Sequence, residues 1–168
     1  MVINYKNDFL SNDDKLIKAI QNTIGKPLSK LSISDLASIN KTSDQDLMTE
    51  NDNRGVYIFR DALTQNPFYV GKCSARVFVE RIPMHFDLRP TGWFNQYLKY
   101  LANYLEEQIK NQIPSDSAMR HALDYVLNHH ELVLIKFDVK EYKHINDLES
   151  KLRIHLNPVL NSKKKNKA

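Results

Sequence analysis

Two residues in the middle of the chain suit the binding and hydrolysis of a phosphodiester. Arg81 and His85 are four positions apart, so a helix that continued through both would place their side chains on one face. An arginine guanidinium offers a planar set of donors to phosphate oxygens, and an imidazole can donate, accept or move a proton near neutral pH. The pair alone leaves a structural alternative open, an exposed arginine beside a histidine whose hydrogen bonds are satisfied.

A tyrosine-rich segment comes directly before this pair. Tyr57, Tyr69 and Lys72 lie in a stretch that also contains two glycines, Gly55 and Gly71. Their phenol and ammonium groups would add hydrogen-bond donors and a positive charge to the same site. Tyrosines are also common in strands for packing reasons, so filling of the core is the alternative interpretation.

A carboxylate near the C-terminus could complete the site. Glu149 is one position away from the apolar stripe of Leu148 and Leu152, so we expect it at the rim of the buried face of a helix. A carboxylate at such a place needs a cation. The cation could be a divalent metal ion or Arg153, four residues later, in an ordinary surface pair of little energetic weight.

The segments that carry these residues predict an α+β fold. Residues 55–59 (GVYIF) and 67–71 (PFYVG) are β-prone runs joined by a turn, which predicts a β-hairpin. Residues 131–139 (ELVLIKFDV) have a nearly continuous apolar centre, which is typical of a central strand. We therefore expect a small central sheet, antiparallel or mixed, made of the hairpin plus a third strand and flanked by helices.

Helices are expected around these strands. Residues 74–86 have a helical pattern, although Pro83 would end or kink the helix. Residues 94–113 carry apolar side chains at helical spacing and predict the longest helix. Another helix should follow a Ser115 cap, and the apolar stripe over residues 145–156 predicts the last one.

Residues 1–50 are predicted to form an N-terminal helical arm. A first amphipathic helix should begin after an Asn12 cap and end at Gly25, and a second, shorter helix should follow. A polar loop then leads to the main domain at residues 51–162. Residues 163–168 (KKKNKA) form a short basic tail.

The charge distribution favours an anionic partner. The chain of 168 residues has a net charge of +4; residues 1–53 contain eight acids and six bases, so residues 54–168 carry +6. A positive field of this kind attracts polyanions such as nucleic acid.

The composition is that of a globular protein of a reducing compartment. The single cysteine, Cys73, excludes an internal disulfide and a cysteine-rich zinc cluster. No apolar run is long enough to span a membrane, and the N-terminus does not have the pattern of a secretory signal. We therefore expect a cytoplasmic protein without a membrane partner.

Together, these residues resemble the GIY-YIG nuclease family in order, type and spacing. The matching residues are Gly55-Val56-Tyr57, Tyr69-Val70-Gly71-Lys72, Arg81, His85, Leu148-Glu149 and Asn157-Pro158-Val159-Leu160-Asn161. The resemblance spans residues 55–161. Valine replaces the middle isoleucine in both tripeptides, which is a conservative change.

Two departures from the family pattern concern spacing. Arg81 lies ten residues after Gly71, further than in compact members, so Arg76 is a rival for the family's arginine. We favour Arg81 because only it has a histidine, His85, four residues later, as in the family. Residues 87–130 are also longer than the corresponding part of compact members, and we interpret them as a helical insertion.

The resemblance implies a metal-dependent endonuclease that hydrolyses phosphodiester bonds of double-stranded DNA. Glu149 would hold Mg²⁺ or another divalent cation such as Mn²⁺, and Arg81 would bind the scissile phosphate. Tyr57 would position or deprotonate the attacking water, assisted by His85 or Lys72. Because a tyrosine with a pKa of about 10 is a poor base, a neighbouring cation would have to lower that pKa.

Supporting roles are implied for four further residues. Tyr69 would form hydrogen bonds in the same site, and Asn161 would orient Glu149 or the phosphate. Gly55 and Gly71 would keep the hairpin ends free of side chains where the backbone approaches DNA.

The small core with helical additions is most similar to a type II restriction endonuclease, which we expect to act as a homodimer on a symmetric DNA site. A nuclease of a phage or mobile element, or a repair nuclease, is the alternative within the family. A DNA-binding module that has lost catalysis is the alternative from another class, and the presence of every expected residue type argues against it.

Overall fold

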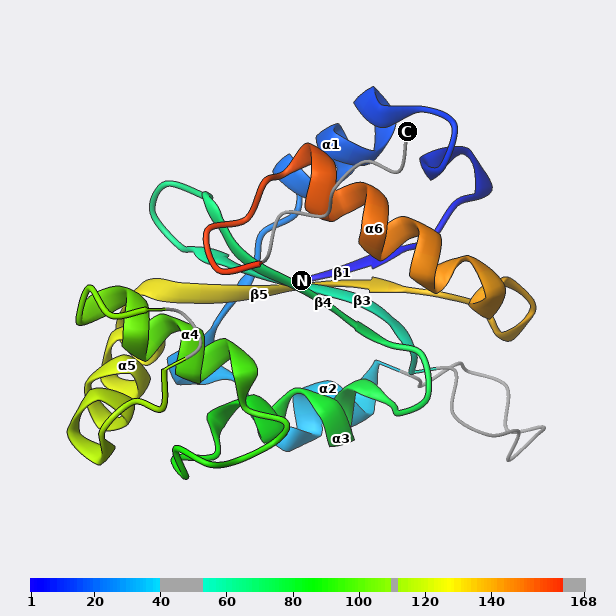
Figure 1. Ribbon diagram of the computed structural model, residues 1–168. Coiled ribbons are helices and arrows are strands. Elements are labelled where there is room, and N and C mark those ends of the chain that lie inside the picture. Colours follow the sequence, from blue (N-terminus) through cyan, green and yellow to red (C-terminus); the bar gives the residue numbers. More distant parts are fainter. Residues whose placement is uncertain (40–52, 110–111, 162–168) are drawn as a thin grey trace.

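A five-stranded mixed sheet forms the middle layer of the computed structural model, which describes residues 1–39, 53–109 and 112–161 (Figure 1). Its strands are β1 (Val2–Asn4), β2 (Lys26–Pro27), β3 (Gly55–Asp61), β4 (Pro67–Cys73) and β5 (His130–Lys136). Their order is β1-β5-β3-β4, with β2 also paired to β5. Only the β1–β5 pair is parallel among the pairs of the described residues.

Helices cover both faces of the sheet. The upper face in Figure 1 carries α1 (Asp13–Gln21) and α6 (Ile145–His155). The lower face carries α2 (Ile33–Ser38), α3 (Phe78–Arg81), α4 (Gln96–Leu105) and α5 (Asp116–His129). Short 3-10 turns lie at Asn7–Phe9, Leu28–Lys30, Pro83–Phe86 and Val139–His144.

Alternate side chains of the central strands build two cores. Val56 and Ile58 of β3 point to the upper core, whereas Tyr57 and Phe59 point to the lower one. β5 is divided in the same way and is buried on both faces. Its continuous apolar run follows from this double burial.

The α+β class and the main elements agree with expectation. The β3–β4 hairpin forms, β5 is a central strand, and α6 is a helix with buried Leu148 and Leu152. Asn12 caps α1 by accepting a hydrogen bond from the backbone N–H of Lys15 (3.0 Å), and Ser115 caps α5 in the same way.

The N-terminal segment is more than a helical arm. It supplies β1 and β2, which pair with β5 and make the segment part of the sheet. The sequence pattern missed these strands because they contain only three and two residues. The first helix also ends earlier than expected, at Gln21, and Ile24 lies beyond it with 84% of its surface exposed.

Two helices of the lower layer are shorter than their patterns predicted. α4 ends at Leu105 rather than near residue 113, because Glu107 adopts a left-handed conformation (φ 53°) that no α-helix continues through. The pattern over residues 74–86 yields only the short α3, followed by a 3-10 turn that begins at Pro83. Proline cannot donate the next helical hydrogen bond, so the helix breaks there.

Some expectations lie outside the described residues, namely the domain boundary near residue 50 and the basic tail at 163–168. Within the described part of the chain, no helix is long and apolar enough to cross a membrane.

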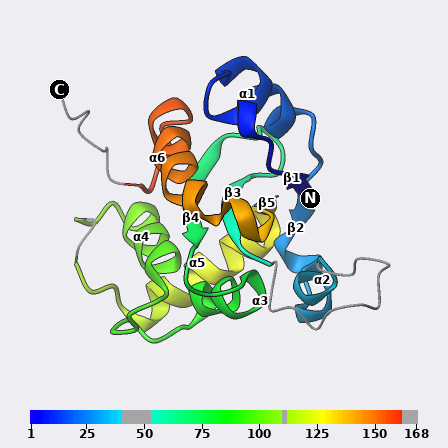
Figure 2. The same ribbon diagram turned by 90° about the vertical axis from the view of Figure 1, so that its right-hand side faces the viewer.

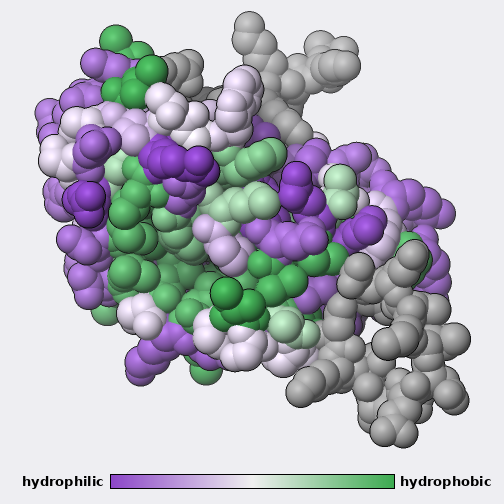
Figure 3. Space-filling view, turned by 90° about the horizontal axis from the view of Figure 1, so that it is seen from below, coloured by the Kyte–Doolittle hydropathy of each residue, from purple (hydrophilic) through white to green (hydrophobic). Residues whose placement is uncertain are grey.

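Seen from below, apolar side chains gather on part of the lower face (Figure 3).

Candidate active site

The two glycines of the hairpin make room for close packing. Tyr57 and Gly71 are register partners on β3 and β4, and a Cβ on Gly71 would lie 2.3 Å from the Tyr57 hydroxyl oxygen. Gly55 has φ 155°, and a Cβ there would lie 1.9 Å from the carbonyl oxygen of Ile135 on β5. Gly71 therefore accommodates the Tyr57 ring, and Gly55 accommodates the backbone of β5. The close approach of these glycines to DNA stays a prediction.

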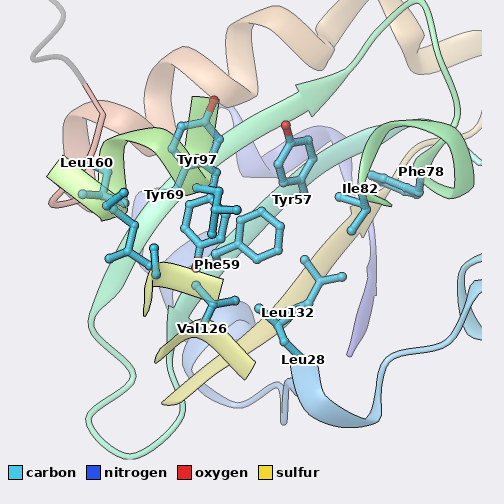
Figure 4. Packing of buried hydrophobic residues seen from close by; sticks show 14 of the residues in the cluster. Leu28, Tyr57, Phe59, Tyr69, Phe78, Ile82, Tyr97, Val126, Leu132 and Leu160 are labelled. Carbon is cyan, nitrogen blue, oxygen red and sulfur yellow. The ribbon is translucent and has the colours of Figure 1, made fainter. Parts of the chain in front are cut away.

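Tyr57 anchors the lower half of the site, where its ring packs near those of Phe59 and Tyr69 (Figure 4). Its hydroxyl oxygen lies 2.6 Å from Nε2 of His85. Tyr57 is 1% exposed and His85 is fully buried, whereas Arg81 is partly exposed and close enough to act on the pKa of both. The three side chains are thus neighbours although the helix that should carry Arg81 and His85 breaks at Pro83.

Burial decides the protonation of this cluster. It raises the pKa of Tyr57 well above 10, with Tyr69 adding to the rise and Arg81 opposing it. It also lowers the pKa of His85 well below 6.5, and Arg81 lowers it further. The expectation that a neighbouring cation lowers the Tyr57 pKa is therefore wrong for this structure, because loss of hydration outweighs Arg81. These directions favour the neutral phenol of Tyr57 and the neutral imidazole of His85.

Arg81 and its rival Arg76 occupy different positions. Arg81 Nη1 donates a hydrogen bond to the carbonyl oxygen of Phe94 (2.8 Å), and its guanidinium carbon lies 5.6 Å from the centre of the Phe94 ring. Arg76 is exposed, and its guanidinium carbon lies 5.2 Å from the centre of that ring. Arg81, not Arg76, acts on the pKa of Tyr57. Sequence reasoning missed Phe94, whose only signal was an aromatic pair following Gly92.

Glu149 forms the upper half of the site. It lies on α6, is 5% exposed, and accepts a hydrogen bond from Nη1 of Arg153 (3.0 Å). Its other oxygen, Oε2, is 3.8 Å from Nζ of Lys72. The pair with Arg153 is therefore formed, but it is a buried pair and not the ordinary surface pair expected for this alternative.

Lys72 belongs with Glu149 rather than with Tyr57. On β4 it is two positions after Val70, which points to the upper core, and it faces α6 across the sheet from Tyr57. Lys72 therefore does not assist Tyr57 directly. Of the two residues expected to assist Tyr57, His85 and Lys72, only His85 lies beside it.

The edge strand β4 joins the two halves. In side view, α6 lies above β4 and α4 lies below it (Figure 2). Burial raises the pKa of Tyr69 on β4 to about 12 against the opposing effect of Arg81, and Arg153 and Glu149 from the upper side also act on it. Tyr69 thus lies within electrostatic reach of both halves.

Asn161 supports this edge strand. Its side-chain oxygen accepts a hydrogen bond from the N–H of Val70 (2.6 Å), and its amide nitrogen donates to the carbonyl oxygen of Val70 (2.9 Å). Leu160 donates from its N–H to the carbonyl oxygen of Phe68 (2.8 Å). The expectation that Asn161 orients Glu149 or the phosphate is corrected, because both polar atoms of its side chain hold β4.

A divalent cation has one candidate ligand here. Among the described residues, no group of three or more His, Cys, Asp or Glu side chains could hold a metal ion. The buried Glu149 carboxylate by itself fits Mg²⁺ or Mn²⁺, because these ions keep water and phosphate oxygens as most of their ligands. The two cations beside it, Lys72 and Arg153, would favour an additional anion such as a phosphate.

Comparisons with models of protein families, with curated proteins and with solved structures found no match to this chain.

Proposed function

We propose that this chain is a metal-dependent endonuclease of double-stranded DNA that works in the manner of GIY-YIG nucleases. One observation carries the proposal: the Tyr57 hydroxyl lies 2.6 Å from Nε2 of His85 and within electrostatic reach of Arg81 on one face of the sheet, and Glu149 lies with Lys72 on the other face. Phosphodiester hydrolysis needs a proton acceptor, phosphate-binding cations and a metal ligand, and this arrangement contains all three.

The proposed role of Arg81 is to bind the scissile phosphate. Its guanidinium is partly exposed and close enough to act on the pKa of Tyr57, so a phosphate oxygen bound by it would lie near that hydroxyl. To bind the phosphate fully, Arg81 would exchange its hydrogen bond to the Phe94 carbonyl for one to a charged oxygen, which is the stronger acceptor.

Tyr57 and His85 would remove the proton of the attacking water together. Tyr57 would accept this proton as its own passes to Nε2 of His85, so the high pKa of Tyr57 is no obstacle to the transfer. The bound phosphate would bring negative charge next to His85 and so raise the affinity of the imidazole for a proton.

Glu149 would hold the divalent cation. When bound, the ion supplies stabilisation of the negative charge on the leaving 3′ oxygen. Lys72, 3.8 Å from Glu149, would bind a phosphate oxygen on the same side. The charge of +6 in residues 54–168 supports a polyanionic substrate.

The finer form of the proposal is a type II restriction endonuclease that acts as a homodimer on a symmetric DNA site in the cytoplasm. The mass of the protein–DNA complex on a cleavable duplex tests the homodimer, which predicts two chains per duplex. Discrete fragments from phage DNA would support site-specific cutting, whereas a continuous smear would favour a phage, mobile-element or repair nuclease.

A DNA-binding module without catalysis is the second candidate. The observation that favours it is the burial of the site: Tyr57 is 1% exposed, and Arg81 is bonded to Phe94. A module of this kind would bind duplex DNA and leave it intact with any divalent cation.

The decisive experiment is cleavage of plasmid DNA at saturating protein, with Mg²⁺ or with EDTA. We expect cutting only with Mg²⁺, its loss in Arg81→Ala, and a much smaller effect in Arg76→Ala. Arg120→Ala, which removes an exposed arginine of α5, is the charge-matched control and should cut as the wild type does. Equal cutting in EDTA would overturn the metal role, and loss of cutting in Arg76→Ala but not in Arg81→Ala would overturn the assignment of the arginine.

A further inference from the structure

Trp93 lies on the surface of the protein and not in its core. It is 86% exposed, although it is the only tryptophan of the chain and the largest side-chain type. Its neighbour Phe94 is 47% exposed. Tryptophan usually buries most of its ring, so adjacent exposed aromatic side chains indicate a contact surface.

The loop that carries Trp93 is held firmly in place. The buried side chain of Asn95 donates hydrogen bonds to the carbonyl oxygens of Asp87 (2.6 Å) and Arg89 (2.7 Å). Lys99 Nζ donates to the carbonyl oxygen of Gly92 (2.8 Å). The exposure of Trp93 is therefore built into the fold of residues 87–95 and does not arise from a loose loop.

Positive charge surrounds the aromatic pair. The guanidinium groups of Arg76 and Arg81 both lie over the Phe94 ring, at 5.2 and 5.6 Å from its centre. A hollow of about 320 Å³ beside Trp93 is lined in part by Arg89, and the carboxylate of Asp87 in this hollow is already bonded to Arg89 (2.5 Å). Exposed aromatic rings interleaved with arginines suit a ligand that combines flat rings with phosphates.

We propose that Trp93 stacks on a nucleobase that is unstacked from its neighbours in the DNA bound by this chain and that Arg76 binds a neighbouring phosphate. The inference rests on the proposed function and extends it by naming a contact that positions the substrate. A protein partner is the other possible occupant of an exposed aromatic surface. The arginines around Phe94 favour the nucleic acid, because an apolar protein surface would leave their charges without an anion.

The same loop connects the stacked base to the scissile phosphate. Trp93 is adjacent to Phe94, whose carbonyl oxygen accepts the hydrogen bond of Arg81, and Arg81 lies within electrostatic reach of Tyr57. A base held on Trp93 would therefore determine which phosphate along the strand meets Arg81. Trp93 is in this sense a positioning residue, since it acts on the reaction through the register of the DNA.

The test uses the tryptophan fluorescence of the full chain, excited at wavelengths that tyrosine does not absorb. It then reports Trp93 alone, because the chain has one tryptophan. Duplex oligonucleotide is added in EDTA, so that binding is measured without cleavage, and anisotropy of labelled DNA gives the fraction bound. We expect the fluorescence to be quenched in parallel with binding. We expect Trp93→Ala to bind about 5- to 150-fold more weakly and Trp93→Phe to recover much of the loss.

Salt dependence separates stacking from charge. Trp93→Ala should keep the wild-type slope of log affinity against log salt, whereas Arg76→Ala should reduce that slope by about 1. Leu63→Ala, which removes a 92% exposed side chain from the hairpin turn, is the matched control and should bind as the wild type does.

The outcomes separate this inference from the proposed function. Normal cleavage and binding with unchanged Trp93 fluorescence, or wild-type affinity of Trp93→Ala, would overturn the stacking contact and leave the nuclease intact. If Trp93→Ala changed the oligomeric state of the protein and kept its DNA affinity, the loop would be assigned to self-association instead. A wild-type chain that binds no DNA would overturn both proposals.

Discussion

The hydroxyl of Tyr57 lies 2.6 Å from Nε2 of His85, and both side chains are buried from solvent. A phenol and a neutral imidazole at this distance form one hydrogen bond, whose donor is set by the tautomer of His85. Arg81 is close enough to lower the pKa of both groups, although burial outweighs it at Tyr57. The contact therefore joins two groups that can exchange a proton, beside the positive charge of Arg81.

Removing that hydroxyl should affect cleavage far more than folding. We expect Tyr57→Phe to cut DNA about 10²- to 10⁴-fold more slowly in single-turnover measurements, because the proton path to His85 is lost. The free energy of unfolding should fall by about 1–3 kcal/mol, since His85 Nε2 loses its partner.

Tyr97→Phe is the matched control for this variant. Tyr97 is also fully buried and forms a hydrogen bond with a histidine, Nδ1 of His130, on the same lower face. It should lose a similar amount of stability and keep its cleavage rate. Equal loss of cleavage in both variants would show that any damage to the lower core inactivates the protein, and the role of Tyr57 would be withdrawn.

Gly71→Ala should destabilise the hairpin. The new methyl group would lie 2.3 Å from the Tyr57 hydroxyl oxygen, and Tyr57 is too buried to move aside. Overpacking of this kind costs about 1–3 kcal/mol, which urea unfolding can measure. In a Tyr57→Leu background, where the end of the ring is absent, the same substitution should cost less. Additive losses would contradict the packing explanation.

Stability should fall in mild acid because of the buried histidines. The pKa of His85 is lowered well below 6.5 and that of His130 to about 4, mainly by burial. A group whose pKa is lower in the folded state binds more protons when unfolded, so its contribution is complete above pH ~6.5 and is lost as the pH falls toward the folded pKa. Each histidine adds a slope of at most about 1.4 kcal/mol per pH unit.

Substitution of His85 tests this pH dependence. Thermal or urea unfolding should show that the free energy of unfolding declines less between pH 8 and pH 5 in His85→Gln than in the wild type. The part of the decline that is due to His130 should remain. His121→Gln, which changes an exposed histidine of α5, should leave the decline unchanged. An unaltered pH dependence in His85→Gln would mean that His85 does not remain neutral in the folded protein.

The elements that could be predicted from the sequence are those whose pattern is local. Alternation within the hairpin, the apolar run of β5 and the stripe of α6 each depend on burial of one segment against the core, so periodicity is sufficient to find them. The end of α4 could not be found in this way. The apolar stripe continues past Leu105 to Ile109, but the chain turns at Glu107, and Ile109 is 77% exposed.

The candidate site shows the same limit. The spacing of Arg81 and His85 predicts one continuous helix, yet a helix break separates them, and both still act on Tyr57. The side of the sheet on which Lys72 lies depends on the register between β3 and β4, which places it with Glu149. Phe94 reaches Arg81 only because Asn95 holds its loop, and no pattern in the sequence predicts a contact that depends on such a loop.

The last prediction concerns Glu149→Gln, which keeps the shape of the side chain and removes its charge. If Glu149 holds the divalent cation, cleavage should fall by orders of magnitude at saturating Mg²⁺, because the leaving oxygen loses its stabilisation. Binding of Mn²⁺ to the protein–DNA complex, followed by electron paramagnetic resonance, should weaken as well. DNA affinity at low salt should hold or rise, since a negative charge beside Lys72 is gone, and should still fall steeply with added salt.

Glu131→Gln separates the metal role from the loss of a buried ion pair. Glu131 is 6% exposed and accepts a hydrogen bond from Nε of Arg60 (2.5 Å), so it resembles Glu149 in its pairing with an arginine. Both variants should be less stable, because Glu131→Gln takes the carboxylate from the buried Arg60 and Glu149→Gln takes it from the partly buried Arg153. Only Glu149→Gln should lose cleavage and Mn²⁺ binding. If Glu149→Gln cuts at nearly the wild-type rate, its carboxylate serves only Arg153 and Lys72, and the metal site must be sought elsewhere.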